Sequence, residues 1–487
     1  MRAAPLTSVK VGSMDLGRFA TVLTREHFEE LRSGMALARG SLTSRRIWNV
    51  SSTAQGGGVA EMLTTLLAYA RGVGVDARWE VIGGDSAFFT ITKRLHNRLH
   101  GYRGDGGPLG ECEREHYERT LAKNAEALAA ALAPDDAVIL HDPQTAGLVA
   151  AVRACGVPVI WRCHVGVDHS NGSAREAWRF LERYVTEADA CVFSRRAFVW
   201  AELDPARVRI IPPSLDAFAP KNQQLGEVSV AAILSAAGIR GGGSAALAGF
   251  RRMDGTVDFV SRRATVTEDR PLRRGDELVV QVSRWDALKD PQGVVRSFAE
   301  HIAPRSDAHL IYAGPEVDGV ADDPEGLRVL EEVQAQWRSL PASVRARVHL
   351  AELPMSDPEE NAVIVNALQR AATVVVQKSL AEGFGLTIAE AMWKARPVVA
   401  SRIGGIQDQI DDGRTGLLLD DPTELTAFAG AVCGLLKDPA RAQAMGVAAR
   451  EWVRERFLGP RSLLDYLALL DRVINEPSQL TAAGTAS

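Results

Sequence analysis

The sequence predicts an α/β protein with two doubly wound, Rossmann-like domains. A chain of 487 residues is too long for one typical hydrophobic core and has the length of two domains with additions. Each half contains a segment that reads as a buried strand, a glycine-bearing turn and a helix, at residues 46–70 and 371–394. Further short apolar segments end in polar residues or glycines, which is typical of parallel strands at the edge where open sheets bind ligands.

The composition is that of an ordinary globular protein, with 46% hydrophobic and 24% charged residues. A net charge of −5 gives no reason to expect a nucleic-acid or membrane partner. The first ten residues lack the apolar stretch of a signal peptide, and no apolar run approaches membrane-spanning length. The five cysteines show no metal-ligand spacing, which favours reduced thiols and a cytoplasmic location.

The strand, turn and helix at 371–394 organise the rest of the chain. Gly383 and Gly385 allow a tight turn that brings backbone N–H groups close to a ligand. The helix that follows presents unpaired N–H groups and a positive dipole end, which suits a phosphate. Glu382 and Glu390 flank this turn, and their carboxylates are suited to sugar hydroxyls rather than to the phosphate itself. The alternative is an ordinary turn with two surface glutamates.

The second half also supplies two cations. A buried strand leads to Arg284, and Lys289 follows in the loop before a proline. Fixed positive charges stabilise the negative charge that builds on a departing diphosphate. Lysine is rare in this chain, with 8 of the 56 basic residues, so we interpret Lys289 as functional. The alternative is a pair of solvated surface cations.

Three consecutive glycines, at 56–58, separate the first strand of the first half from its helix. Such a run is costly in chain entropy, and it predicts a close approach of the backbone to a ligand. A dinucleotide-binding fingerprint is the rival interpretation, but Glu61 stands where its third glycine belongs. No G-x-x-x-x-G-K-[ST] segment occurs either, so the sequence speaks against both a dehydrogenase and a P-loop protein.

Polar side chains follow two more strands of the first half. One strand ends in His141 and Asp142, and the next is followed by Arg162 and His164. Because parallel strands open at the same edge of a sheet, we expect these residues to converge on an acceptor site. The alternatives are that Asp142 caps the helix that follows it and that His164 is an ordinary core histidine.

These motifs resemble those of known enzymes. Glu382-x7-Glu390 with its Gly-Phe-Gly interior resembles the donor-site motif of retaining family 4 glycosyltransferases, which have the two-domain GT-B fold. Further segments narrow the resemblance to trehalose glycosyltransferring synthases over roughly residues 25–220 and 275–470, about four-fifths of the chain; they include Gly-Gly-Gly-Val-Ala-Glu, His-Asp-Pro-Gln, Trp-Arg-Cys-His and Gln-Val-Ser-Arg-Trp-Asp. The loop at 168–172 and an insertion within 220–275 depart from that family.

The resemblance implies the organisation of the chain. Two Rossmann-like domains of the GT-B fold would face each other across a cleft, with residues 46–219 on the acceptor side and 276–455 binding the nucleotide sugar. The remaining expected parts are an N-terminal helical preamble, a linker with an insertion, and a C-terminal crossover helix with a tail, at residues 1–45, 220–275 and 456–487.

The resemblance also implies a reaction, the transfer of glucose with retention from a nucleoside-diphosphate-glucose to free glucose, giving α,α-trehalose. Arg284 and Lys289 would hold the diphosphate. Glu382 would bind hydroxyls of the donor sugar, Glu390 would bind the ribose, and His164 would contact the donor glucose near the reacting carbon. Further donor-binding residues are expected at Gly57, Gly58, Gly383, Phe384, Gly385, Leu386 and Thr387. Acceptor-binding residues are expected at Glu61, Asp142, Gln144, Arg162 and Asp168.

The same resemblance implies no cofactor and no metal ion, because cationic side chains already neutralise the diphosphate and no Asp-x-Asp motif occurs. The expected partners are a nucleotide sugar and a free sugar, with a homodimer left open. An unphosphorylated acceptor is expected, since Ser51–Glu61 and His141–Gln144 contain no Arg or Lys that could hold a phosphate. One alternative stays open, a different acceptor such as an amino sugar or a secondary-metabolite sugar. A nucleotide-binding regulatory module without turnover would be favoured if Arg284 or Glu382 were missing, but both are present.

Overall fold

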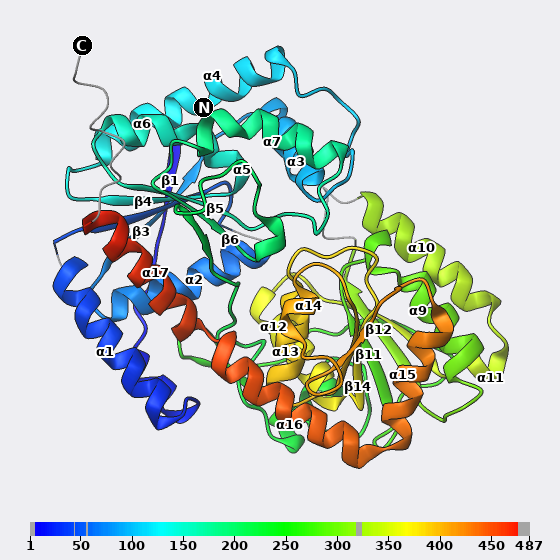
Figure 1. Cartoon of the computed structure of the whole chain (residues 1–487). Coiled ribbons are helices and arrows are strands. Elements are labelled where there is room, and N and C mark those ends of the chain that lie inside the picture. Colours follow the sequence, from blue (N-terminus) through cyan, green and yellow to red (C-terminus); the bar gives the residue numbers. More distant parts are fainter. Residues whose placement is uncertain (1–4, 43, 55–56, 318–323, 476–487) are drawn as a thin grey trace, which may run out of the picture. The chain divides into compact units, whose positions relative to one another are not determined.

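The computed structural model describes residues 5–42, 44–54, 57–317 and 324–475. The chain forms two compact units, and each is described by itself. Unit 1 comprises Met1–Ser214 and Phe457–Ser487, and unit 2 comprises Leu215–Arg456. Each unit contains a mainly parallel β-sheet with helices on both faces (Figure 1). The α/β class with two doubly wound sheets, predicted from the sequence, is confirmed.

Unit 1 has a seven-stranded sheet with the strand order β1-β3-β2-β4-β5-β6-β7. All its strands run parallel except β1, which pairs antiparallel with β3 at the edge and lies in the segment where the sequence predicts only a helix. The strands are β1 (Leu6–Val9), β2 (Arg46–Ser51), β3 (Asp76–Ile82), β4 (Ala137–His141), β5 (Val159–Cys163), β6 (Ala190–Phe193) and β7 (Val208–Ile210).

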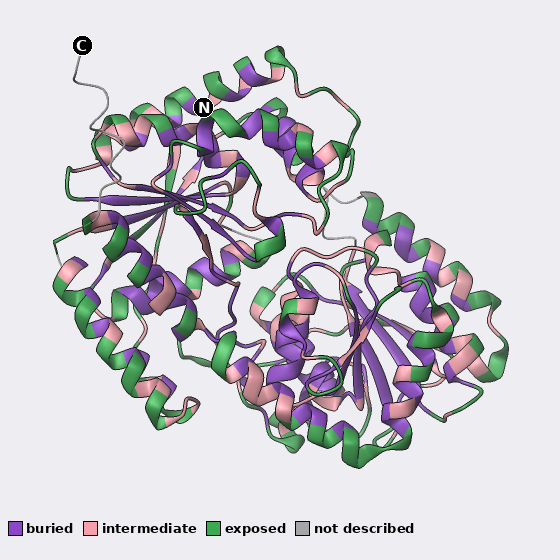
Figure 2. Ribbon diagram, in the orientation of Figure 1, coloured by how far each residue is buried: buried purple, intermediate pink, exposed green. Residues whose placement is uncertain are grey.

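The helices of unit 1 form two layers around this sheet. Helices α1, α2 and α17 lie on one face, and α3, α4, α6 and α7 lie on the other (Figure 1). The described helices are α1 (Arg25–Leu42), α2 (Gly57–Gly72), α3 (Ser86–Leu99), α4 (Glu111–Ala131), α5 (Asp142–Thr145), α6 (Val149–Ala154), α7 (Gly172–Val185) and α17 (Gly459–Asn475). The strands between the layers are buried on both faces (Figure 2), which is why β-branched and aromatic residues fill them without alternation.

Unit 2 has a second seven-stranded sheet, with the order β10-β13-β12-β11-β14-β15-β16. Only β10 is antiparallel, and it extends the sheet next to β13. The strands are β10 (Thr265–Thr267), β11 (Leu278–Val282), β12 (His309–Pro315), β13 (Val348–Leu353), β14 (Val374–Gln377), β15 (Val398–Ser401) and β16 (Leu417–Leu419). The helices around it are α9 (Pro291–Ser297), α10 (Pro324–Ser339), α11 (Ala342–Arg345), α12 (Pro358–Ala371), α13 (Leu386–Trp393), α14 (Ile406–Gln409), α15 (Leu425–Lys437) and α16 (Pro439–Arg456).

Residues 220–275, expected as a linker with an insertion, fold as an integral part of unit 2. They form helix α8 (Glu227–Ala236), a hairpin of β8 (Gly249–Arg251) and β9 (Val257–Phe259), and the sheet strand β10. Ion pairs hold the hairpin and the segment after it to the start of α12: Arg252, in the hairpin, contacts Asp357, and Arg262, after it, contacts Glu360. The sequence signal for a linker was composition, and composition does not reveal ion pairs across about 100 residues.

The strand order fixes where each sheet can bind a ligand. In unit 1 the chain passes from β2 to β3, on one side of β2, and then crosses to β4, on the other side of β2. In unit 2 the same reversal occurs between β11 and β14. Open parallel sheets bind ligands at the carboxyl ends of the two strands that flank such a reversal. The residues that follow β2, β4, β11 and β14 are therefore the ones to inspect.

Candidate active site

In unit 2 the loop after β14 forms the glycine turn that the sequence predicts. Gly385 has a φ of 76° and caps the N-terminus of α13, so its conformation favours glycine. A second turn packs directly onto the first. A Cβ on Gly404 would lie 2.0 Å from the carbonyl oxygen of Glu382, and one on Gly405 would lie 2.7 Å from the Cα of Phe384. The two turns thus touch through backbone, which leaves no room for a side chain at either glycine.

A buried glutamine that the sequence did not single out fixes this turn. The Nε2 of Gln409 donates to the carbonyl oxygens of Phe384 and Gly385, at 2.5 and 3.3 Å. Its Oε1 accepts from the N–H of Ala389, in the first turns of α13, at 3.0 Å. These bonds hold the carbonyl oxygens of the turn beside the start of α13, where Leu386 and Thr387 are predicted to bind the donor through their N–H groups.

The two predicted residues Lys289 and Glu382 contact each other. The Nζ of Lys289 lies 2.6 Å from Oε2 of Glu382, and both side chains are largely buried. The backbone supports the pair, because the N–H of Leu380 donates to the carbonyl oxygen of Leu288 at 2.8 Å. The loop after β11 and the loop after β14 are therefore one braced element at the reversal point of the sheet.

Arg284 lies at the exposed side of this element. Its side chain is 67% exposed, and Nη2 lies 3.2 Å from Oδ2 of Asp286. The next residue anchors the loop, since Trp285 is buried, stacks on Tyr312 and donates through Nε1 to the carbonyl oxygen of Pro315 at 2.9 Å. The guanidinium of Arg284 is thus accessible while its backbone is held in place.

Beneath these loops is a buried ion pair that sequence reasoning missed. Lys378, which follows β14, is fully buried, and its Nζ contacts Oδ2 of Asp290. Asp290 has a φ of 49° and caps α9 through the N–H of Gly293, at 3.1 Å. Gln281 of β11 joins both loops, since its Oε1 accepts from the N–H of Lys378 and its Nε2 donates to the carbonyl oxygen of Lys289. Lysine rarity was the signal that could have marked Lys378.

Glu390 is buried within α13, in contrast to the surface position of the alternative interpretation. Its Oε1 lies 3.6 Å from the Nζ of Lys221, which belongs to the segment before α8. The Nζ of Lys394 donates to the carbonyl oxygen of Glu390 at 3.0 Å and to Oδ1 of Asn222 at 3.1 Å. Residues from the expected linker therefore position one of the two predicted carboxylates.

In unit 1, side chains from three adjacent strands meet at the carboxyl edge. The Nε2 of His141 lies 3.1 Å from Oδ1 of Asn49, and its Nδ1 lies 3.2 Å from Nε2 of His164. The two rings stack with centroids 5.5 Å apart. Burial lowers the pKa of His141 to about 3 and, together with the positive charge of Arg162, lowers that of His164 well below its usual value. Both imidazoles are neutral at neutral pH.

Asp142 does not cap the helix that follows it, so that alternative is wrong. Its backbone has a φ of 64°, and its Oδ1 accepts the backbone N–H of His164 at 2.8 Å. Burial raises the pKa of Asp142 to about 6, against the opposing effects of that hydrogen bond and of Arg162. The carboxylate thus ties the end of β4 to the segment after β5.

The other predicted acceptor residues differ in accessibility. Arg162 is fully buried, and its Nη2 donates to Ser194 Oγ at 3.1 Å, so it acts on its neighbours by charge rather than by presenting a surface to a sugar. Because β5 is covered on both faces, a polar residue within it points into the core. Asp168 forms an ion pair with Arg195, Gln144 is half-buried, and Glu61 is exposed on α2.

The glycine run of unit 1 is described only in part. Gly57 and Gly58 are the first two residues of α2, while Gln55 and Gly56 lie outside the described residues. The predicted contact of Gly57 and Gly58 with phosphate therefore stays a prediction. Arg175 and Arg179, on the helix after the loop at 168–172, are exposed, as helical spacing predicts.

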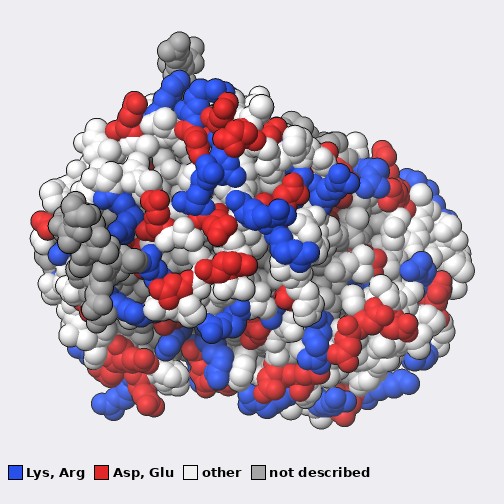
Figure 3. Space-filling view, turned by 45° about the horizontal axis from the view of Figure 1, so that its top comes forward, with Lys and Arg blue, Asp and Glu red and all other residues white. Residues whose placement is uncertain are grey.

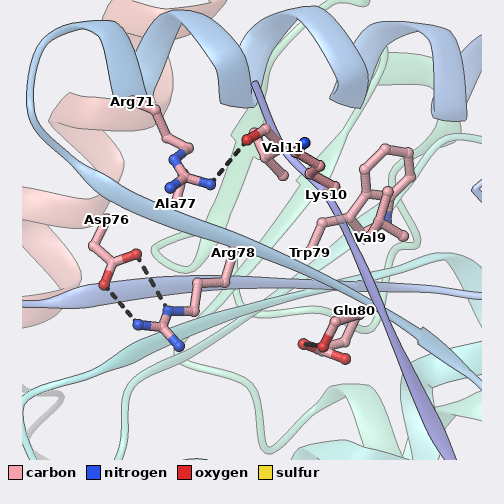
Figure 4. Close-up of a pocket in the computed structure, with 10 residues that line it drawn as sticks. Val9, Lys10, Val11, Arg71, Asp76, Ala77, Arg78, Trp79 and Glu80 are labelled. Atoms are coloured by element: carbon pink, nitrogen blue, oxygen red, sulfur yellow. Dashed lines mark hydrogen bonds and ion pairs between the residues drawn. The ribbon is translucent and has the colours of Figure 1, made fainter. Parts of the chain in front are cut away.

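Charges of both signs are interspersed on the face shown in Figure 3. A pocket of about 280 Å³ lies near the sheet edge at β1 and β3, where Arg71 bonds the carbonyl of Val11 and Arg78 pairs with Asp76 (Figure 4). Within the described residues, no cluster of three or more His, Cys, Asp or Glu side chains could hold a metal ion, and no helix could cross a membrane.

Solved structures match this fold across most of the chain. A UDP-forming α,α-trehalose-phosphate synthase from Burkholderia xenovorans, in complex with glucose 6-phosphate, matches with a TM-score of 0.64 and 17% identity, over 88% of this chain and 99% of that chain. Anabaena HepE, in complex with UDP and glucose, matches with a TM-score of 0.57 and 16% identity over the same shares. The fold is that of the GT-B glycosyltransferases.

Sequence relatives define the family. Residues 49–200 match the family "Trehalose synthase, N-terminal domain", and residues 263–452 match "Glycosyl transferases group 1". A trehalose synthase of Rubrobacter xylanophilus is 34% identical over 96% of this chain and 99% of its own length. One from Pyrococcus horikoshii is 31% identical over 94% and 97%. The chain belongs to the trehalose synthase family. A trehalose phosphorylase of Pleurotus pulmonarius is 27% identical over 86% of this chain and 56% of its own length.

Proposed function

We propose that the protein transfers glucose, with retention, from a nucleoside-diphosphate-glucose to free glucose and so forms α,α-trehalose. The observation that carries this proposal is the braced element of unit 2, where Lys289 and Glu382 meet beside the glycine-capped start of α13. A cation and a helix N-terminus at one point suit a diphosphate, and a carboxylate at the same point suits the hydroxyls of the attached sugar.

This geometry supports the following donor roles. The diphosphate binds the N–H groups at the start of α13 and the cations Arg284 and Lys289, which stabilise the leaving group as the glycosidic bond breaks. Glu390, four residues into α13 from Leu386, binds the ribose. Because these cations compensate the diphosphate charge, the proposal includes no metal ion and no cofactor.

In unit 1, His164 contacts the donor glucose near the reacting carbon, and the polar groups that follow β4 and β5 bind the acceptor. A phosphorylated acceptor requires accessible cations, but Arg162 is fully buried and the segment His141–Gln144 contains none. Retention is supported by the resemblance of the Glu382–Glu390 motif to that of retaining enzymes.

The test is a panel of UDP-, ADP- and GDP-glucose, each combined with glucose, glucose 6-phosphate, glucosamine or no acceptor. The readouts are release of nucleoside diphosphate and the anomeric configuration of the product by proton NMR. We expect α,α-trehalose with free glucose. A parallel arm supplies glucose 1-phosphate with glucose, because relatives include a trehalose phosphorylase. Trehalose from glucose 1-phosphate but not from any nucleotide sugar would overturn the proposed donor.

A competition assay tests which acceptor is preferred. Labelled donor is supplied with glucose and glucose 6-phosphate at equal concentrations. Preferential formation of the phosphorylated disaccharide would contradict the proposed acceptor. If neither glucose nor glucose 6-phosphate accepts the transferred glucose and glucosamine does, an amino sugar replaces glucose as the proposed acceptor.

A further inference from the structure

The side chains of Asn49, His141 and His164 form a continuous hydrogen-bonded chain at the reversal point of the unit 1 sheet. They come from β2, β4 and the residue after β5, three strands that are neighbours in the sheet. The links measure 3.1 Å from Asn49 Oδ1 to His141 Nε2 and 3.2 Å from His141 Nδ1 to His164 Nε2. Asn49 and His141 are buried, whereas His164 is half-buried.

The acceptor at Asn49 determines which nitrogen donates and which accepts in each of the two imidazoles. A neutral imidazole carries one donor and one acceptor nitrogen. Because the Oδ1 of Asn49 can only accept, His141 must carry its proton on Nε2, which leaves its Nδ1 as an acceptor. The Nε2 of His164 must then donate to that Nδ1. The remaining nitrogen of His164, Nδ1, is left as an acceptor for a ligand.

The surroundings of Asn49 argue against a purely structural role. Among the described residues its Nδ2 has no hydrogen-bond partner, and it borders a small cavity of about 40 Å³ lined mainly by apolar side chains of the sheet, α2 and α17, such as Leu63, Leu67 and Leu463. The hydroxyl of Tyr466 at the same cavity also lacks a hydrogen-bond partner within the part of the chain that the structure describes. Leaving a buried amide N–H unpaired is unfavourable, because it loses its hydrogen bonds to water. An apolar residue would fit this cavity better, so the amide is explained by its bond to His141.

We propose that Asn49 is a positioning residue that, through His141, fixes the tautomer of His164 with its proton on Nε2. His164 therefore presents Nδ1 as a hydrogen-bond acceptor to a hydroxyl group of the sugar that it contacts. The contact with a sugar rests on the proposed function, whereas the tautomer of His164 does not. Asn49 itself touches no substrate and acts only through His141.

The first measurement reads the tautomer without any substrate. In protein labelled with ¹⁵N-histidine, long-range ¹⁵N–¹H correlations show which ring nitrogen carries the proton, and His141→Gln and His164→Gln variants assign the signals. We expect both His141 and His164 of the wild type to be protonated on Nε2. A wild-type His164 protonated on Nδ1 would overturn the proposal, whatever the enzymatic activity turns out to be.

Substitutions at Asn49 test whether the acceptor at this position determines the tautomer of His164. Asn49→Leu fills the same volume without an acceptor, and we expect His164 to populate both tautomers and kcat to fall roughly 10-fold. Asn49→Asp keeps an atom that only accepts when ionised, and it should retain the wild-type tautomer and most of kcat. If Asn49→Asp switches the tautomer, or Asn49→Leu leaves both tautomer and kcat unchanged, the proposal is wrong.

Two controls separate positioning from loss of structure. Asn124→Leu removes another buried asparagine of unit 1, one bonded to Gly83 and Thr120, and it should leave the tautomers unchanged. Calorimetric affinity for the nucleoside diphosphate, which the proposed function assigns to unit 2, should be the same in Asn49→Leu as in the wild type. A wild type that shows the expected tautomer but transfers no glucose overturns the proposed function alone.

Discussion

The ammonium group of Lys289 lies 2.6 Å from the carboxylate of Glu382, so two groups proposed to bind different parts of the donor neutralise each other. A bound diphosphate offers Lys289 a second anion, and a sugar hydroxyl offers Glu382 a donor. The pair thus keeps both side chains in place, largely desolvated, before the substrate arrives, and little reorganisation is needed when it binds.

Removal of either donor-site cation should affect turnover far more than folding. We expect Lys289→Ala and Arg284→Ala each to lower kcat by about 10²–10³ at saturating donor, because each removes a charge needed as the leaving group departs. The measurement is the rate of nucleoside diphosphate release. Lys437→Ala, a change at an exposed lysine at the end of α15, is the matched control and should leave the rate unchanged. A near wild-type rate in either test variant would remove that residue from the mechanism.

The two glutamates should differ in what they bind. Glu390→Ala should weaken affinity for the free nucleoside diphosphate, because Glu390, within α13, is proposed to bind the ribose. Glu382→Ala should spare that affinity and lower kcat, because its carboxylate is proposed to bind the transferred sugar. Calorimetric titration with the diphosphate separates the two roles, and equal losses of affinity would contradict the division.

Asp142 should make unit 1 less stable as the pH rises. Its pKa is raised from 3.8 to about 6 in the folded protein, so the folded state holds a proton that the unfolded state has lost between these values. The resulting stability is present below about pH 4 and is lost as the pH passes 6. Asp142→Asn keeps the acceptor for the His164 N–H and suits the positive φ.

We therefore expect Asp142→Asn to be more stable than the wild type by roughly 1–3 kcal/mol at pH 7.5, with a smaller difference at pH 4.5. Urea unfolding at the two pH values measures this. A difference that does not grow with pH would show that Asp142 keeps an ordinary pKa.

The buried pair of Lys378 and Asp290 should show strong coupling. Lys378→Met leaves the carboxylate of Asp290 without its cation and should destabilise unit 2 by about 3–5 kcal/mol. Adding Asp290→Asn should restore part of the loss, because the amide still caps α9 and carries no charge. We expect a coupling energy of roughly 1–3 kcal/mol from urea unfolding of the four proteins. Additive losses would mean that the two side chains do not interact in solution.

Much of the fold could be read from the sequence because the signals are local. Apolar runs that end in glycine or polar residues mark the parallel strands, and the carboxylates of the donor motif lie eight residues apart on one turn and helix. What could not be read are contacts between distant segments. Asn49 meets His141 across 92 positions, and Lys378 meets Asp290 across 88. A sequence motif or helical repeat spans far fewer residues than these separations, so it cannot include both members of either pair.

The burial of particular side chains also differs from what the sequence suggests. Arg162 looks like an accessible cation in the sequence, but a strand covered on both faces turns it into the core. Gln409 looks like a surface residue of a short helix, yet it is fully buried and holds the donor turn. In each case the deciding fact is the second layer of helices, which local periodicity does not specify.

The position of α17 has a consequence for how the protein is made. Unit 2 is a continuous stretch of chain, whereas the apolar face of α2 in unit 1 is covered by the side chains of Leu463, Tyr466 and Leu467 from α17. During synthesis, which proceeds from the N-terminus at about 5–20 residues per second, this face stays uncovered while some 400 further residues are added. Unit 2 can therefore complete its core first, and the nascent chain exposes the apolar face of α2 until α17 leaves the ribosome.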